Sequence, residues 1–332
     1  MDYDIHGLIK IKSNLKLPIP SYFKVEEVKN PDVEILQQEL DFKKPEGNKV
    51  MRIGYYYWFD GSRLRFLHPA GARLELEDLT GKPKVRLNSR FKRFGSDAAL
   101  EFLVDRILLI KLAQKGCVFV HAGAVEWDGN SALIVAPPDF GKTSTVLSLV
   151  GSGAKLLGDD HVILTPEGEV LCYPRPQTIS PQTLTGNVVR PLRFHKRWLA
   201  KLGFPYAVYL RIFGSPAERR EISSEFIAER GKARFAFALD GFAEEGRLDS
   251  ISREKFVETM IFPMPFMTGF PDSYADIYLY LNSESLWLVL NRMMGTARQF
   301  LSDVECFSVR GTSLTSWAEI IRRKINEGLD EK

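Results

Sequence analysis

The sequence predicts an α/β protein with a β-rich part at its N-terminal end, and three observations lead to this expectation. An apolar run at 131–135 has the length of a buried strand, and a short loop joins it to a helical pattern at 143–150. The first 95 residues hold short alternating segments separated by turn residues. Helical periodicity then returns at 283–298 and 316–324, with an apolar strand-like run at 304–309 between them.

Residues 1–95 are expected to form a smaller β-rich domain. Residues 50–58 and 63–67 predict one hairpin across an Asp-Gly turn, and residues 73–76 and 84–87 predict another across Gly-Lys-Pro. Turn residues of this kind between runs of apolar and β-branched residues are typical of antiparallel strands.

The remainder, residues 96–332, is expected to form a second domain that opens with a helix. Ser96 is a suitable N-cap and Gly116 a suitable stop, and the apolar residues between them recur mostly on one side. This helix leads directly into an apolar run at 117–120, which predicts the first strand of the second domain.

The loop after the 131–135 run has the spacing of a phosphate-binding loop. It consists of Ala136, Pro137, Pro138, Asp139, Phe140, Gly141, Lys142 and Thr143, and Ser144 follows it. The general pattern opens with Gly, whereas this loop opens with Ala136 and then has two prolines, which fix the backbone and remove two N–H donors. Gly141 still permits a tight turn before the lysine.

In such a loop the backbone, the lysine and the hydroxyl residue each make a different contact with the nucleotide phosphates or their metal ion. Backbone N–H groups and the positive end of the helix hold the phosphates, and Lys142 reaches the terminal ones. The hydroxyl of Thr143 is expected to ligate magnesium. The loop therefore predicts binding of ATP with Mg²⁺.

Two acidic residues follow the loop helix at the end of a short predicted strand, 154–158. Asp159 and Asp160 lie 17 and 18 residues after Lys142. Because adjacent strand residues face opposite sides, one carboxylate could face a metal while the other faces an acceptor hydroxyl. An acidic pair in a turn is otherwise usually just solvated.

His121 ends the apolar run at 117–120 and lies 21 residues before Lys142. One interpretation is a core histidine that bonds a backbone carbonyl. The other is an imidazole hydrogen-bonded to Asp159, which would orient that carboxylate and set its basicity. Spacing alone leaves both open.

Taken together, these segments resemble the HPr kinase/phosphorylase family of P-loop kinases, whose core is shared with phosphoenolpyruvate carboxykinase. The resemblance is carried by His121-Ala-Gly-Ala, Asp128-Gly-Asn, the loop 136–143 and Gly153-Ala-Lys-Leu-Leu-Gly-Asp-Asp, in the family's order and at family-like separations. It covers about residues 117–176 and weakens beyond them. It implies a kinase core with a mixed sheet and flanking helices.

The resemblance also implies a role for each site residue. Lys142 and the loop amides would bind ATP, Thr143 and Asp160 would hold magnesium, and Asp159, supported by His121, would take the proton from the acceptor hydroxyl. Which of the two carboxylates is the base stays open. The glycine-rich downstream signature of bacterial HPr kinases is absent from the sequence, and Tyr173-Pro-Arg-Pro stands near its place.

Arg175, within that segment, offers a guanidinium suited to phosphate oxygens, and its flanking prolines indicate a fixed loop. The alternative is a surface arginine in an irregular connection.

Composition sets the outer bounds. The chain has 332 residues, of which 45% are apolar and 26% charged, as in an ordinary globular protein. No apolar stretch reaches membrane-spanning length, and the first residues lack the order of a secretory signal, so a cytoplasmic protein is expected. The three cysteines are far apart and form no C-x-x-C pair, which argues against a disulfide framework or a zinc site.

A basic segment, Arg190–Arg220, carries eight Lys or Arg against one Glu, a local charge of +7 in a chain of net charge +3. A solvated face is the commonest explanation, followed by binding of an acidic or phosphorylated acceptor; nucleic acid ranks last because no recognised motif accompanies the segment. Family members often form oligomers, so a homo-oligomer is an open expectation.

The predicted function is therefore transfer of the γ-phosphate of ATP to a hydroxyl group of a protein serine or a small molecule, with Mg²⁺ as cofactor. Two alternatives stay open. One is a nucleotide sensor with little turnover, which the two loop prolines make worth considering. The other is a carboxykinase-like enzyme, which the short chain and the missing second metal-ligand set weaken.

Overall fold

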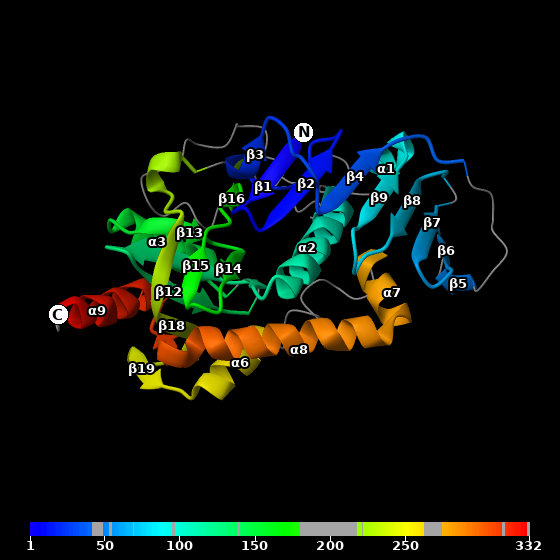
Figure 1. Ribbon diagram of the computed structural model, residues 1–332. Helices are drawn as coiled ribbons and strands as arrows, with labels where there is room; N and C mark the ends of the chain where they lie inside the picture. Colours follow the sequence, from blue (N-terminus) through cyan, green and yellow to red (C-terminus); the bar gives the residue numbers. More distant parts are fainter. Residues whose placement is uncertain are drawn as a thin grey trace, which may run out of the picture.

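The fold is mixed α/β, as the sequence predicts, and contains two mixed sheets (Figure 1). The computed structural model describes residues 1–41, 49–52, 55–68, 70–94, 97–137, 140–179, 218–220, 222–261, 274–313 and 316–330. No helix within these ranges is both long and apolar enough to cross a membrane.

The N-terminal sheet is built from residues 2–87. Among the described residues it has nine strands in the order β3-β1-β2-β4-β9-β8-β7-β6-β5. Its strands are β1 (Asp2–Ile5), β2 (Ile9–Ser13), β3 (Lys24–Val25), β4 (Val33–Gln37), β5 (Lys49–Arg52), β6 (Tyr55–Phe59), β7 (Arg63–Leu67), β8 (Arg73–Glu77) and β9 (Lys84–Leu87). Strand β4 runs parallel to β2 and β9, and the other pairs are antiparallel.

Both predicted hairpins are present, as the β6–β7 and β8–β9 pairs. The prediction of one continuous strand over residues 50–58 was wrong, because β5 and β6 are separate strands that pair antiparallel with each other. Leu64, Phe66, Leu74 and Leu76 alternate inward on β7 and β8, which is why these segments read as strands. The opposite face carries cross-strand ion pairs, for example Arg65 to Glu75 at 2.7 Å.

The second sheet contains the loop and the acidic pair. Its strands are β10 (Val118–Val120), β11 (Gly123–Trp127), β12 (Asn130–Val135), β13 (Lys155–Gly158), β14 (Val162–Leu164), β15 (Glu169–Leu171), β18 (Arg230–Phe242), β19 (Arg247–Ser250) and β20 (Glu305–Gly311). The order is β10-β14-β15-β18-β12-β11-β13, and β20 pairs with both β18 and β19. Strands β12, β18 and β20 are mutually parallel, so their C-terminal ends lie at one edge. A separate antiparallel pair joins β16 (Gln177–Ile179) to β17 (Glu218–Arg220).

Helices cover both faces of this second sheet. The helices of the described residues are α1 (Ser89–Phe94), α2 (Asp97–Gln114), α3 (Lys142–Gly151), α6 (Arg253–Ile261), α7 (Tyr274–Leu281), α8 (Ser283–Phe300) and α9 (Ser316–Asp330), with short 3₁₀ turns η1 (Ser21–Phe23), η3 (Ser224–Phe226) and η4 (Leu301–Asp303). Helices α3 and α9 lie on one face of the second sheet and α2, α6 and α8 on the other, whereas α1 packs against β8 of the N-terminal sheet. Ala132 and Ile134 of β12 face α3 and α9, whereas Leu133 and Val135 belong to the core that includes α2, α6 and α8. The period of two along β12 thus matches a strand covered on both sides.

Helix α2 lies between the two sheets and is buried on nearly all sides (Figure 1). The sequence indicates a one-sided apolar stripe, but residues 103–113 are all buried, because the N-terminal sheet lies on one side and β10 on the other. One continuous hydrophobic core therefore joins the regions before and after residue 95. Charged residues on this helix, such as Asp105, are buried too and must find partners.

Candidate functional site

The loop between β12 and α3 forms the turn that the sequence predicts. Gly141 has φ of 85°, in the left-handed region that glycine adopts without strain, and it precedes the first helical residue, Lys142. The Thr145 amide and hydroxyl both donate to the Gly141 carbonyl, at 2.9 and 3.0 Å. Within the described part of the chain no side chain caps this helix, so the N–H groups of its first turn have no side-chain acceptor at the N-cap.

The remaining residues of the loop region are placed only in part. Ala136 is buried at the end of β12, and Thr143 and Ser144 lie partly exposed in the first turn of α3. Pro138 and Asp139 lie outside the described residues. The structure therefore positions the glycine, the lysine and the two hydroxyls of the predicted loop on one helix start.

Lys142 points from this helix to the acidic pair. Its side chain is buried, and its Nζ donates to the backbone carbonyl oxygen of Asp159 at 2.9 Å. The same Nζ lies 3.9 Å from Oδ1 of Asp160. Burial lowers the pKa of the lysine, and the charges of Asp160 and Asp159 oppose that shift.

Asp159 is buried directly after β13. Its Oδ1 is shielded from solvent and has no hydrogen-bond partner. Burial, reinforced by the charge of Asp160, raises the pKa of Asp159 to about 6. A buried carboxyl oxygen without a partner is costly, which makes this group a candidate for a task other than stability.

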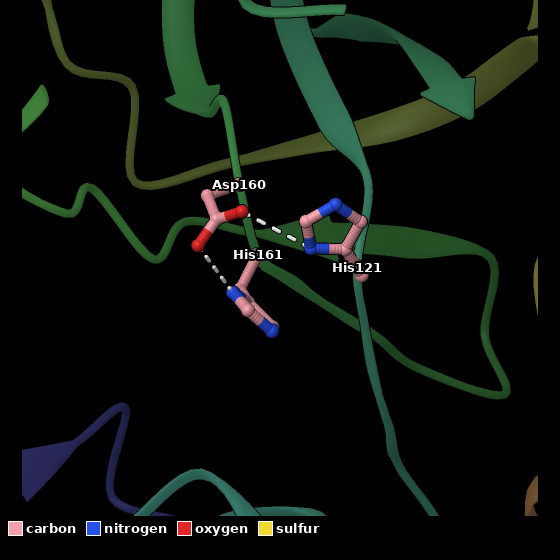
Figure 2. Close-up of side chains that lie close together, drawn as sticks. All are labelled: His121, Asp160 and His161. Carbon is pink, nitrogen blue, oxygen red and sulfur yellow. Dashed lines mark hydrogen bonds and ion pairs between the residues drawn. The ribbon is translucent and has the colours of Figure 1, made fainter. Parts of the chain in front are cut away.

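Asp160 stands between two imidazoles, as Figure 2 shows. Its Oδ1 lies 3.0 Å from Nδ1 of His121, and its Oδ2 lies 3.0 Å from Nδ1 of His161. The expectation that His121 bonds Asp159 was wrong: β10 ends with the imidazole turned to Asp160 instead. Burial alone would raise the pKa of Asp160, but the two imidazoles, which lie within hydrogen-bond distance of both of its oxygens, outweigh that effect and hold the pKa well below its usual range.

The two carboxyl groups of the acidic pair thus lie in opposite environments. Both carboxylate oxygens of Asp160 lie within hydrogen-bond distance of charged or polar side chains, whereas one carboxyl oxygen of Asp159 has no hydrogen-bond partner. Their pKa values are consequently pushed apart, one downward and one upward. Of these two carboxyl groups, Asp159 is the one whose pKa is raised toward neutral pH.

Arg175 is buried rather than on the surface, which excludes the alternative of an exposed arginine. Its Nη1 donates to Asp160 Oδ2 and to Glu101 Oε1, each at 3.2 Å, and its Nη2 contacts Asp105. The Nε of the same guanidinium is buried without a partner. Arg175 therefore ties Asp160 to helix α2, and both of its terminal nitrogens are already engaged by carboxylates.

Sequence reasoning missed three contributors to this cluster, namely His161, Glu101 and Asp105. A signal was present for each. His161 directly follows the acidic pair, and Glu101 and Asp105 are carboxylates at i and i+4 in a mostly apolar helix, where a buried charge needs a partner. Only the tertiary structure shows that the partner of Asp105 is Arg175, 70 residues later in the chain.

One group of side chains within the described residues has the donors for a metal ion. The ligand atoms of His121, Asp160 and His161 all lie within 4.8 Å of one another. Two imidazole nitrogens and one carboxylate oxygen suit a divalent transition metal such as Mn²⁺ at least as well as Mg²⁺. Burial lowers the pKa of His161 to about 3, so this imidazole stays neutral and keeps a lone pair for a metal.

The basic segment Arg190–Arg220 is described only at its end. Residues 180–217 lie outside the described residues, and Glu218–Arg220 form β17 against β16. The predicted acceptor-binding role of this segment stays a prediction.

In comparisons with known proteins, no protein-family model matches the chain and no curated protein matches it significantly. The functional conclusion consequently depends on the geometry of the residues described above.

Proposed function

We propose that this protein is a P-loop kinase of the HPr kinase/phosphorylase type that transfers the γ-phosphate of ATP to a hydroxyl group. The observation that carries the proposal is the contact of Lys142 with Asp159: the lysine of a phosphate-loop sequence donates to the backbone carbonyl of a residue whose buried carboxyl group has an unpartnered oxygen. A loop lysine reaches the terminal phosphates of a nucleotide. The γ-phosphate would therefore lie beside the group best suited to accept a proton.

The reaction assigns one proton transfer to Asp159. Its ionised carboxylate accepts the proton of the acceptor hydroxyl while the oxygen of that hydroxyl forms a bond to the γ-phosphorus. The bond between the γ-phosphorus and the bridging oxygen breaks, and ADP leaves. The raised pKa of Asp159, about 6, is close to the working pH, which is where a general base is most effective.

The other groups stabilise charge and hold geometry. Lys142 and the first-turn amides of α3 neutralise the phosphate oxygens. Asp160, with His121 and His161, would hold the divalent cation together with the hydroxyl of Thr143. The ion, held there, would offset the negative charge of the phosphate oxygens. Arg175 acts through Asp160, which it holds in position by bonding both Asp160 and the carboxylates of helix α2.

The decisive experiment follows label from γ-³²P-ATP into cell extract in the presence of Mg²⁺ or Mn²⁺. The wild-type protein is expected to label an acceptor, and Asp159→Asn to lower the rate by about 10²- to 10⁴-fold, the usual contribution of a general base. Glu258→Gln, the same carboxylate-to-amide change on an exposed face of α6, is the matched control and should transfer label normally.

Three other outcomes would replace this proposal. Label transfer that persists undiminished in Asp159→Asn removes Asp159 as the base. ATP binding without any labelled product would identify a nucleotide sensor. Release of carbon dioxide that depends on oxaloacetate and a nucleoside triphosphate would identify a carboxykinase-like enzyme.

A further inference from the structure

An aromatic cluster lies at the C-terminal edge of the second sheet, next to the phosphate loop. Phe140, the residue before Gly141, has its ring centroid 6.2 Å from that of Phe242 and 5.6 Å from that of Trp317. The rings of Phe242 and Trp317 are 4.8 Å apart. Trp317 is fully buried, whereas Phe242 is 56% exposed. The cluster thus has a buried floor and an exposed aromatic surface.

The exposure of Phe242 depends on an irregularity in β18. Phe235, Phe237 and Leu239 alternate toward the core that includes α9. The register against β20 then shifts between Leu239 and Gly241, where Gly241 has φ of 135°. This bulge places Phe242 on the same face as Leu239, against Trp317, rather than on the opposite face. Bulges of this kind re-aim a side chain and are common beside functional sites.

The floor beneath Phe242 is closely packed. A Cβ added at Gly311 would lie 2.9 Å from two ring atoms of Trp317 and 2.5 Å from the Ser316 hydroxyl oxygen. That hydroxyl accepts from the amides of Thr312 and Ser313 and so holds the turn from β20 into α9. The position of Trp317 is therefore tightly determined, which gives Phe242 a rigid support.

The strand order separates this cluster from the acidic pair. Strand β12, which ends in the phosphate loop, has β11 and then β13 on one side and β18 and then β20 on the other. Asp159 and Asp160 follow β13, and Phe242 ends β18. A nucleotide whose terminal phosphate faces the acids would therefore extend its base toward Phe242. Ligands of open α/β sheets commonly lie across the carboxyl ends of the strands in this manner.

We propose that Phe140 and Phe242 form a platform on which the purine base of ATP stacks. This inference rests on the proposed function, since it places the base relative to phosphates held at the loop. Flat aromatic side chains bind bases through their faces, and the exposed face of Phe242 is continuous with the phosphate loop through Phe140.

The test compares ATP with inorganic tripolyphosphate, which has the phosphates without the base, by calorimetry in the presence of Mg²⁺. Phe242→Ala is expected to weaken the affinity for ATP about ten- to hundredfold, the loss typical of one base–aromatic stack, and to leave the affinity for tripolyphosphate unchanged. Phe242→Trp should retain ATP binding, and its additional fluorescence relative to wild type should be quenched by ATP and not by tripolyphosphate. Tyr280→Ala is the control, because it removes a 67% exposed aromatic side chain on α7, on the far side of the molecule from α9 (Figure 1).

The outcomes separate this inference from the proposed function. Unchanged ATP affinity in Phe242→Ala, or an equal loss for both ligands, overturns the platform while the kinase proposal stands. Failure of the wild-type protein to bind either ligand overturns the kinase proposal and the platform with it. Should Phe242→Ala not fold, unquenched fluorescence of Phe242→Trp on ATP binding overturns the platform by itself.

Discussion

The ammonium group of Lys142 donates a 2.9 Å hydrogen bond to the backbone carbonyl oxygen of Asp159. This contact joins the start of helix α3 to the end of strand β13. Helix α3 follows β12, and a single strand, β11, separates β12 from β13 in the sheet. It also holds the lysine beside the carboxyl group of the same residue. In the proposed reaction, this backbone interaction would fix the cation relative to the base.

The buried ammonium gives the first prediction. Lys142→Met should lower the phosphotransfer rate at least about a hundredfold, because a preorganised cation at the phosphates is lost. The free energy of unfolding should fall by only about 1–3 kcal/mol, because the buried carbonyl oxygen of Asp159 loses its donor and Asp160 loses a cation 3.9 Å away. Label transfer and urea denaturation measure the two effects. Lys155→Met, on an exposed position of β13, should alter neither. A large loss of stability in Lys142→Met would show that the lysine is mainly structural.

The raised pKa of Asp159 predicts the pH dependence of catalysis. The base acts when ionised, so kcat/KM should rise with pH through about 6 and fall roughly tenfold per pH unit below that value. The protonation states of Asp160 and His161 do not change across this interval. The pKa of Asp160 lies well below its usual range, and the pKa of His161 is about 3.

The pH profile has a specific control. His121→Gln should retain the inflection near pH 6, since the titrating carboxyl group is still present, whereas the residual activity of Asp159→Asn should show none. An inflection that disappears with His121 would assign the titration to the imidazole and remove Asp159 as the base.

The buried guanidinium of Arg175 predicts a large effect on stability. Arg175→Met removes the cation that contacts Asp105, Glu101 and Asp160, and should lower the free energy of unfolding by about 3–5 kcal/mol, as measured by urea denaturation. Arg230→Met, whose side chain is 55% exposed, should stay within about 0.5 kcal/mol of wild type. A loss below about 1 kcal/mol for Arg175→Met would mean that the carboxylates are satisfied in another way.

Close packing at Gly123 gives a prediction about how helix α3 packs against strand β11. A Cβ at this position would lie 2.5 Å from Cγ2 of Val146, so Gly123→Ala should cost about 1–3 kcal/mol in the free energy of unfolding. Adding Val146→Ala removes the clashing methyl group, and the double variant should lose less stability than the sum of the two single changes. Gly295→Ala in α8 meets no atom within 4 Å and should be neutral or stabilising. Simple additivity in the double variant would refute the proposed clash.

Much of the local structure follows from the sequence for identifiable reasons. Strand β12 and helix α3 were predictable because a short continuous apolar run and then a period of 3.6 meet at a glycine-containing loop, and the structure has both. The β6–β7 and β8–β9 hairpins were predictable because turn residues separate alternating segments. Residues 50–58 misled the prediction, because periodicity cannot reveal a turn within a run of aromatic and apolar residues.

The sequence by itself determined which ionisable and phosphate-loop side chains lie at the ends of β10, β12 and β13, because strand ends, loop spacing and acidic pairs are local patterns. Only the tertiary structure decided that His121 meets Asp160 rather than Asp159, and that Arg175 meets Asp105 and Glu101. Those contacts depend on sheet order and on how α2 packs between two sheets. The physical reason is that a buried charge needs a partner, while the identity of that partner is set by the topology that brings distant segments together.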